Sequence, residues 1–410
     1  MSVGADVVVI GAGAAGLSCA QALVRAGLRP VVWEARDRPG GRIATWRTPD
    51  DQPIELGAQV VHGSDNPLWM ILEEHELTSS FRDARPSAVL SGQNVSMGAL
   101  ARTGTPPWYV ESRLPEAPAG ATVAELLANL DLPPREHRSG SEWLRQTWGT
   151  DPEQLDGREL AAVRRHENTG EGEYLLRRGY DILVGRLADG LSISFSRPVE
   201  GVELDPSCVR LYSGDHSLTA RAAVLTAPPS SVVDGPRPIS GLPSEKARAA
   251  RSLPSGDALS LVAELPERAA ENRVIFDADH RAGFLRTFAG SRHALAVAKG
   301  ETASWLRSAA RAPGRLEALL TRAGLAGGIE HVHVTDWGLD PYARGGFSFP
   351  VSRLDIAARA WAEPIAGTLF FAGEATCGHR WPASVHGAVA SGERAAAEVE
   401  ESLRCQSNSR

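Results

Sequence analysis

Apolar and polar residues at the start of the chain follow the order strand, helix, strand. Residues 7–10 form a short β-branched apolar run, the pattern of a strand buried in a parallel sheet. Residues 17–26 place apolar side chains at helical spacing, and Gly27 ends that pattern. Residues 30–33 form a second apolar run. This order predicts a β–α–β unit, which is typical of parallel sheets in α/β proteins.

The middle of the chain divides into a helical segment and a strand-rich segment. Three short helix patterns, separated by Pro, Gly and Ser, are found at residues 122–130, 141–147 and 154–164. Apolar and polar residues alternate instead at residues 258–263, 273–277, 283–289 and 294–298, which predicts strands. We expect a second domain that combines a mostly helical piece with a sheet.

Length and composition fit two domains. The chain has 410 residues, 42% apolar and 23% charged, which is the balance of a globular protein too long for one compact core. The net charge of -7 argues against nucleic-acid and anionic-membrane partners. No stretch reaches the roughly 18 to 20 apolar residues that span a bilayer. The four cysteines lack metal-site spacing. We expect a cytoplasmic protein without a metal, and a homodimer is one open alternative.

A glycine motif joins the first predicted strand to the first predicted helix. Gly11, Gly13 and Gly16 have the G-x-G-x-x-G spacing of a dinucleotide-binding turn. Gly11 permits the tight turn, Gly13 lets the backbone approach a pyrophosphate, and Gly16 lets the helix pack on the strand. Glu34 ends the second strand at the distance expected for an acid that binds a ribose hydroxyl. The motif predicts a dinucleotide but leaves open whether it is NAD or FAD.

The residues after Glu34 favour FAD. Arg36 is followed by a glycine turn that contains Gly41 and ends at Arg42. This combination resembles the second motif of the FAD-binding amine oxidase superfamily, in which the arginine lies near the FAD phosphates. An ordinary surface turn is the alternative interpretation of these residues alone.

A second motif near the C-terminus resembles the same family. Gly373 and Glu374 follow a short apolar run, and Ser384 and Val385 begin a pattern of small residues typical of a packed helix. The resemblance implies that Glu374 binds the ribityl hydroxyls and that the helix start faces the N1–C2=O edge of the flavin. A helix N-terminus there would stabilise the negative charge of the reduced ring.

The resemblance also implies the fold and further cofactor contacts. It implies an α/β fold in which a Rossmann-type FAD-binding domain is interleaved with a smaller α+β substrate domain. The FAD-binding domain would comprise residues 1–75, 170–235 and 335–405, and the substrate domain residues 76–169 and 236–334. The further residues expected to contact FAD are Ala15, Ala35, Gly57, Ala58, Gln59 and Val199.

Five side chains are expected on the substrate side of the flavin: His62, Ser260, Trp337, Phe347 and Ser384. In polyamine oxidases a histidine matching His62 faces the substrate, although a lone histidine is as often structural. Phe347 matches one aromatic of the substrate cage in mitochondrial monoamine oxidases, and Ser384 replaces the other. Core packing is the alternative role of Trp337 and Phe347.

Two positions depart from the family pattern. Gly346 stands where mitochondrial monoamine oxidases carry a cysteine joined to the flavin, so we expect FAD to be bound noncovalently. Ser260 stands where most of the family carries a lysine that assists the reaction with oxygen. We interpret the two lysines of the chain, Lys246 and Lys299, as solvated surface residues. A ring of Ser260, Asp257 and His62 is an alternative way to position a water.

The resemblance implies an FAD-dependent oxidoreductase that acts on a small-molecule amine, amino acid or amide. A hydride would pass from the substrate carbon to flavin N5, water would hydrolyse the imine, and O2 would be the electron acceptor. Because one fold hosts several chemistries, a desaturase or cyclising oxidase is a second hypothesis. A flavoprotein without turnover is the third, and the missing lysine is its support.

Overall fold

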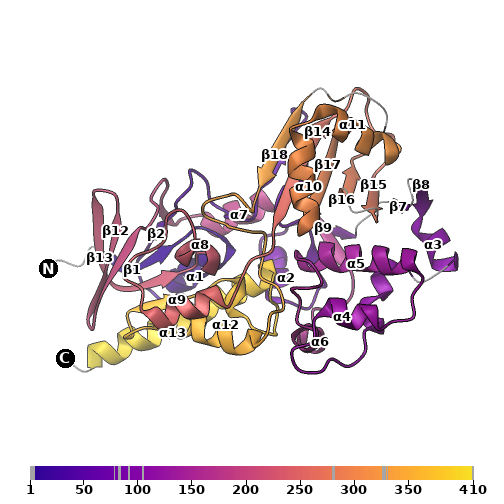
Figure 1. Ribbon diagram of the computed structural model, residues 1–410. Coiled ribbons are helices and arrows are strands. Elements are labelled where there is room, and N and C mark those ends of the chain that lie inside the picture. Colours follow the sequence, from indigo (N-terminus) through magenta and orange to yellow (C-terminus); the bar gives the residue numbers. More distant parts are fainter. Residues whose placement is uncertain are drawn as a thin grey trace.

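The computed structural model describes residues 5–77, 79–81, 85–90, 93–103, 106–278, 282–325, 329 and 331–408. Most of the strands gather into two seven-stranded sheets. In Figure 1 the first sheet lies near the two chain ends, and the second lies on the opposite side of the molecule, above a group of helices. The predicted α/β fold class is confirmed, with mixed sheets and helices in both halves.

The first sheet contains both predicted N-terminal strands. Its central strand, β1, runs parallel to β2 on one side and to β13 on the other. Across the sheet the strands are β10 (Ser192–Ser194), β2 (Pro30–Trp33), β1 (Ala5–Ile10), β13 (His216–Leu225), β12 (Cys208–Ser213) and β11 (Gly201–Asp205), and β19 (Leu369–Phe371) also pairs with β13. Segments far apart in the sequence therefore build one sheet.

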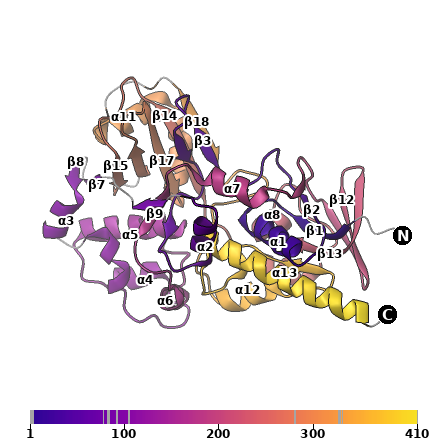
Figure 2. The same ribbon diagram turned by 180° about the vertical axis from the view of Figure 1, so that it is seen from behind.

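Helices cover both faces of the first sheet, which explains why β1 is apolar at consecutive positions. Val7 and Val9 pack toward one face and Val8 toward the other, and none of the three has exposed surface. Figure 2 shows two of these helices, α1 and α13, lying side by side. The covering helices are α1 (Ala14–Arg25), α7 (Tyr180–Ala188) and α13 (Val385–Asn408) on one face, and α8 (Pro229–Val233), α9 (Ser244–Arg251) and α12 (Leu354–Ala362) on the other.

The second sheet joins two separate stretches of the chain. In order across it, the strands are β18 (Val332–Asp336), β14 (Ala258–Glu264), β17 (His293–Lys299), β16 (Gly283–Thr287), β15 (Arg273–Asp277), β7 (Arg85–Leu90) and β8 (Gln93–Ser96). The four strands predicted between residues 258 and 298 are present. β7 and β8 lie in the segment predicted to be mostly helical, and β7 pairs with β15 in parallel. Helices α10 (Glu301–Ala310) and α11 (Pro313–Arg322) pack on one face of the sheet.

The helical segment beside the second sheet contains α3 (Met97–Thr103), α4 (Val123–Ala128), α5 (Pro134–Trp148) and α6 (Gly157–His166). Local signals set these ends: Thr122 caps α4 in a capping box, and the Asp156 side chain caps α6. Helix α5 begins seven residues before the predicted pattern because Pro134 is well suited to a first helical position. Gly149, with φ 74°, ends it.

Helix α9 shows where the predicted domain boundary differs from the packing. We assigned residues after 235 to the substrate domain, yet α9 contacts α8 and α12. Ala249, Ala250 and Leu253 join the core beneath the first sheet. The amphipathic pattern of a short helix predicts that one face is buried, but it does not identify the element that the face packs against.

The remaining elements connect the two halves. They are β3 (Thr45–Arg47), β4 (Pro53–Glu55), β5 (Val61–His62), β6 (Ser79–Phe81), β9 (Glu173–Leu176), α2 (Pro67–Glu74) and three 3-10 turns (Pro107–Tyr109, Glu111–Arg113 and Glu374–Thr376).

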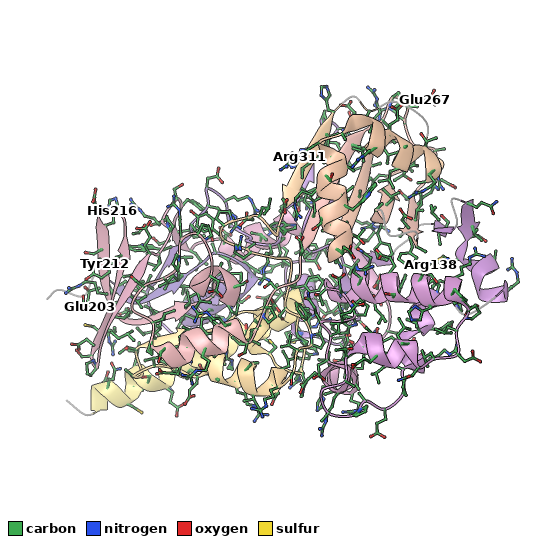
Figure 3. The ribbon with its side chains drawn as sticks, viewed as in Figure 1. Arg138, Glu203, Tyr212, His216, Glu267 and Arg311 are labelled. Atoms are coloured by element: carbon green, nitrogen blue, oxygen red, sulfur yellow. The ribbon has the colours of Figure 1, made fainter. Side chains whose placement is uncertain are left out.

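Figure 3 shows Glu203 and Tyr212 together on the outer strands of the first sheet, at the opposite end of the molecule from Arg138 of α5. Within the described ranges, no helix is both long and apolar enough to cross a membrane.

Candidate functional site

One cavity of about 790 Å³ extends from the first sheet to the second. Its nucleotide end is lined by Ile10, Trp33 and Thr226, at the carboxyl ends of the parallel strands β1, β2 and β13. Its other end is lined by Phe276 and Phe284 of the second sheet. Ligands of open parallel sheets bind at the carboxyl ends of the strands, so the first end has the expected place of a dinucleotide.

The glycine motif forms a tight turn at the nucleotide end. Gly11 has φ 105°, a conformation that side chains other than hydrogen rarely adopt. A Cβ on Gly16 would lie 1.9 Å from the carbonyl oxygen of Gly11, so the first turn of α1 packs directly on the end of β1. Gly13 pairs with Gly40 through a backbone bridge and has no neighbour closer than 3.9 Å to an added Cβ. The tight turn at Gly11 and the close packing at Gly16 match their predicted roles, and the approach of a pyrophosphate to Gly13 stays a prediction.

Glu34 holds its predicted place at the end of β2. Its side chain is 3% exposed, and its carboxylate accepts hydrogen bonds from the backbone N–H groups of Ala12 (2.7 Å) and Arg36 (2.8 Å). Each carboxylate oxygen has a further lone pair that can accept a ligand hydroxyl. The backbone bonds fix the orientation of this carboxylate before a ligand binds.

Two arginines tie the N-terminal motif to the C-terminal half of the chain. Arg36 pairs with Asp340 (2.6 Å), and its guanidinium lies over the ring of Tyr342. Arg42 donates to the Glu374 carboxylate (2.9 Å) and to the Gly346 carbonyl (3.0 Å). These acceptors follow Arg42 in the chain by 332 and 304 residues. The predicted placement of Arg42 at the phosphates stays a prediction.

Glu374 is a carboxylate of the cavity wall with several hydrogen-bond donors around it. It is 5% exposed and accepts from Arg42, from the Ser348 hydroxyl, and from the backbone N–H groups of Ser348 (3.3 Å) and Ala383 (3.0 Å). Glu374 also lines the cavity. This carboxylate therefore positions residues from three segments around the place where the flavin is expected.

Helix α13 points its N-terminus at the cavity, as the sequence predicts. The Ser384 hydroxyl accepts a hydrogen bond from the N–H of Gly387 (3.0 Å), which is an N-cap bond. Ser384 and Val385 line the cavity, and α13 runs from Val385 to Asn408. The positive end of a helix dipole stabilises nearby negative charge.

The cavity wall fits FAD. A pre-oriented carboxylate at each end of the nucleotide half suits ribose and ribityl hydroxyls, and the N-terminus of α1 suits a pyrophosphate. Gly16 is the one predicted cofactor residue that does not line the cavity among those described, because it packs against β1. The predicted cofactor residues on the wall are Gly11, Gly13, Ala15, Glu34, Ala35, Arg36, Gly41, Arg42, Gly57, Ala58, Gln59, Val199, Gly373, Glu374, Ser384 and Val385.

The backbone at Leu56 is fixed by two of the predicted substrate-side residues. The Leu56 carbonyl accepts from the Ser260 hydroxyl (2.7 Å) and from the Trp337 indole N–H (2.8 Å). A Cβ on the next residue, Gly57, would lie 1.8 Å from the Arg42 carbonyl oxygen. Ser260 and Trp337 line the cavity and hold this segment in place. A catalytic role for either residue stays a prediction.

The proposed ring of Ser260, Asp257 and His62 does not form. Asp257 pairs with Arg307 (2.8 Å) and is not among the described residues that line the cavity. His62 does line the cavity and lies 3.8 Å from the carboxylate of Glu173. Alternate residues of a strand face the same side, and Ala258 and Ser260 of β14 both line the cavity. Asp257, one residue before Ala258, therefore points away from it.

Sequence reasoning missed the aromatic chamber at the far end of the cavity. The Trp143 ring lies 6.0 Å from Trp108, 5.3 Å from Phe276 and 5.7 Å from Phe284, measured between centroids. All four side chains line the cavity. They come from a 3-10 turn, a helix and two strands, so no local motif joins them. The alternation of β15 and β16 gives the face of each phenylalanine but not its aromatic partners.

The interpretation of both lysines as solvated surface residues is wrong. Lys246 is 4% exposed, and its ammonium donates to the carbonyls of Ala360, Trp361 and Glu363 at the end of α12. Lys299 is half-buried and lines the cavity. Lysine carries a long apolar stem that can be buried when carbonyl groups meet its charged end. Such carbonyl partners come from tertiary packing, which the local pattern does not record.

His386 gives a prediction about pH. Burial, together with nearby His62, lowers the pKa of His386 from 6.5 to about 4. The unfolded chain therefore takes up a proton near pH 6.5 while the folded protein does not, so stability should fall as pH decreases from 6.5 toward 4. Between pH 7 and pH 5 we expect His386 to cost about 2 kcal/mol of unfolding free energy.

Chemical denaturation of the wild type and His386→Gln at both pH values measures this effect. The variant should lose less stability on acidification than the wild type. Parallel pH profiles for the two proteins would contradict the burial of a neutral imidazole.

Comparisons with known proteins agree with this geometry. The sequence model of the family "Flavin containing amine oxidoreductase" matches residues 14–400. Lysine-specific histone demethylase 2 of Homo sapiens is 24% identical over 457 residues, covering 97% of this chain and 55% of the demethylase. The chain spans about half the length of the curated relatives it matches.

Two solved oxidases have a similar fold. Cyclohexylamine oxidase from Brevibacterium oxydans IH-35A superposes with a TM-score of 0.77 at 22% identity, covering 98% of this chain and 99% of that one. Putrescine oxidase bound to putrescine gives a TM-score of 0.77 at 20% identity, covering 96% and 98%. These identities are low, so the two likenesses bear on the fold.

Proposed function

Because the chain belongs to the flavin-containing amine oxidoreductase family, we propose that it oxidises a C–N bond of a small-molecule amine. It is a flavoenzyme, and its cofactor is FAD. The finer proposal is that the substrate is an amine or amino acid, that the imine product is hydrolysed by water, and that O2 accepts the electrons.

The observation that carries the proposal is the continuity of the cavity. A single space joins the wall that fits FAD to the aromatic chamber, and Phe347 and Trp337 also line it. A substrate held in the chamber would therefore meet the expected flavin position without leaving the protein. Binding sites of this kind combine an apolar wall with a few placed polar groups.

The chain contributes binding, orientation and electrostatics to such a reaction. FAD, when bound, supplies the two-electron acceptor for the hydride that leaves the substrate carbon. The N-terminus of α13 favours negative charge beside it. The apolar side chains of the aromatic chamber favour the neutral form of an amine, and the low pKa of His386 keeps that imidazole uncharged at neutral pH. An amine that enters deprotonated needs no strong general base.

Anaerobic mixing of the purified holoprotein with amines, polyamines and L-amino acids tests the proposal. We expect one class to bleach the flavin absorbance and to release an aldehyde or keto acid after hydrolysis. Readmission of air should restore the absorbance if O2 is the acceptor despite Ser260 at the family's lysine position. A slow return in air with rapid return on adding an artificial acceptor would contradict O2 as the acceptor.

Two other outcomes would replace the proposal. Bleaching that yields a dehydrogenated product without ammonia, aldehyde or keto acid would support a desaturase or cyclising oxidase. A yellow protein that no amine or amino acid reduces would contradict amine oxidation, and it would favour a flavoprotein without turnover if desaturase substrates also failed.

A further inference from the structure

The second sheet directs one lysine into the cavity among apolar side chains. Val297 and Lys299 lie two residues apart on β17, so both face the cavity. Val297 pairs with Phe284 of β16, which in turn pairs with Phe276 of β15. Lys299 is therefore a cation placed on the same face of the sheet as the aromatic chamber.

Register also places Lys299 toward the flavin end of that face. It pairs with Ala258 across the β14–β17 ladder. A Cβ built on Gly346 would lie 2.9 Å from the Cβ of Ala258, so the two residues are in contact. Gly346 is the residue expected directly in front of the flavin. The Lys299 ammonium is 4.8 Å from the ring centroid of Phe347, the next residue. A group bound at Lys299 would therefore be close to the reacting part of the substrate.

The hydrogen bonds of Lys299 also join β17 to helix α5. Its ammonium donates to the carbonyl of Gln146 (2.7 Å) in the last turn of α5, where a cation is favourable. The Gln146 side chain in turn accepts from the Lys299 backbone N–H (3.0 Å). These bonds hold the side chain in one orientation at the cavity wall, with the ammonium against the Phe347 ring. An ammonium has three N–H donors, which suits it to bridge a carbonyl and a bound anion.

The positive charge of Lys299 favours an anionic substrate group at this point. Two acids that line the cavity have partners other than Lys299: Glu167 pairs with Arg164 (3.0 Å), which also binds Glu111 (2.6 Å), and Glu173 lies 3.8 Å from His62. The side chains of His62 and Glu173 are nearly half exposed, which places them at the rim. A second ammonium on a substrate, as in a diamine, would meet Lys299 inside an apolar chamber and be repelled.

We propose that the substrate is an amine with an aromatic or similarly large apolar arm and a carboxylate, and that Lys299 binds the carboxylate while the chamber of Trp108, Trp143, Phe276 and Phe284 holds the arm. This inference rests on the proposed amine oxidation. Lys299 then selects aromatic amino acids over the corresponding amines and over diamines. A charge-assisted bond to a carboxylate in a desolvated site accounts for that selection.

The test compares substrates that differ only in the carboxylate. The reduction of the flavin in the holoprotein is followed with phenylalanine against phenethylamine, tryptophan against tryptamine, and putrescine. We expect the wild type to prefer an acid to its amine, with putrescine poorest. Lys299→Met should lower kcat/KM for the acid by roughly 10- to 100-fold and leave the amine unchanged or improved.

Two variants control for a structural role of Lys299. Lys299→Arg keeps the charge and should retain the preference for the acid. Arg138→Gln removes one positive charge from the exposed side of the same helix α5 and should behave as the wild type. Loss of α5 packing would slow the acid and the amine equally, so an equal effect of Lys299→Met on both would overturn the inference.

A binding measurement separates this inference from the proposed function. Indole-3-acetate carries the ring and the carboxylate but no amine, and its binding can be followed by the shift of the flavin spectrum. Binding that weakens at least about tenfold in Lys299→Met supports the anion site even if no amine reduces the flavin, which would defeat the proposed function alone. Flavin reduction by amines with no binding of aromatic acids would overturn the anion site alone.

Discussion

Replacing Glu374 by alanine should remove most of the bound FAD and lower the unfolding free energy by about 3 to 5 kcal/mol. The reason is that the carboxylate accepts from Arg42, from Ala383 and twice from Ser348 while only 5% exposed. Without it, the largely buried guanidinium of Arg42 keeps only the Gly346 carbonyl of the two acceptors named above, and the backbone N–H groups of Ser348 and Ala383 lose the carboxylate. FAD affinity should fall at least about tenfold, since the same carboxylate borders the cavity.

The ratio of flavin to protein absorbance after dialysis and the thermal unfolding of the apoprotein measure these two effects separately. Glu374→Gln keeps the shape of the side chain and should be intermediate in both. Glu267→Ala removes an exposed carboxylate on the second half of the molecule and serves as the matched control. A Glu374→Ala protein that retains its flavin through dialysis would refute the assignment of this residue to the cofactor site.

Replacing Gly16 by alanine should prevent FAD binding and destabilise the protein by about 3 kcal/mol or more. The added Cβ would lie 1.9 Å from the Gly11 carbonyl oxygen and 3.1 Å from the Thr226 hydroxyl. Backbone cannot yield as a flexible side chain can, so α1 must move away from β1. That movement would displace the helix N-terminus from the expected position of the pyrophosphate.

Gly185→Ala is the matched control, because Gly185 also lies inside a helix but an added Cβ meets nothing within 4 Å. That variant should bind FAD normally and be as stable as the wild type or slightly more stable, since alanine favours helix. Flavin content and the melting temperature of both variants give the comparison. Equal behaviour of the two alanine variants would show that the α1–β1 contact is looser than the structure indicates.

The nucleotide half of the site could be predicted in detail because its residues are consecutive in short motifs. Gly11, Gly13 and Glu34 lie within one β–α–β unit, whose geometry follows from local turns and strand pairing. Glu374 and Ser384 were expected at the cofactor because their segment resembles the C-terminal motif of the flavin-containing amine oxidoreductase family. In these segments the chemistry and the local backbone are specified by neighbouring residues.

The aromatic chamber could not be predicted, because its residues meet only through tertiary contacts. Trp143 approaches Phe276 and Phe284, which lie more than 100 positions later in the chain, and Trp108 packs on Trp143. Lys299 has the pattern of a polar residue ending a strand, and nothing local shows that this end abuts α5. Asp257 was misplaced for a different reason: it is out of phase with Ala258 and Ser260, which face the cavity from β14, and it pairs with Arg307 of α10.

The sequence by itself determined the fold class and the dinucleotide turn that ends at Glu34, because hydrophobic period and glycine spacing act over a few residues. Glu374 was placed at the cofactor by the resemblance to a known family. Only the tertiary structure decided which side chains form the aromatic chamber, that Lys299 lies on the cavity wall, and that carbonyl groups surround the buried Lys246. The physical reason is that burial and charge depend on neighbours brought together by sheet register and helix packing. A local pattern specifies that a side chain is buried but not which groups surround it.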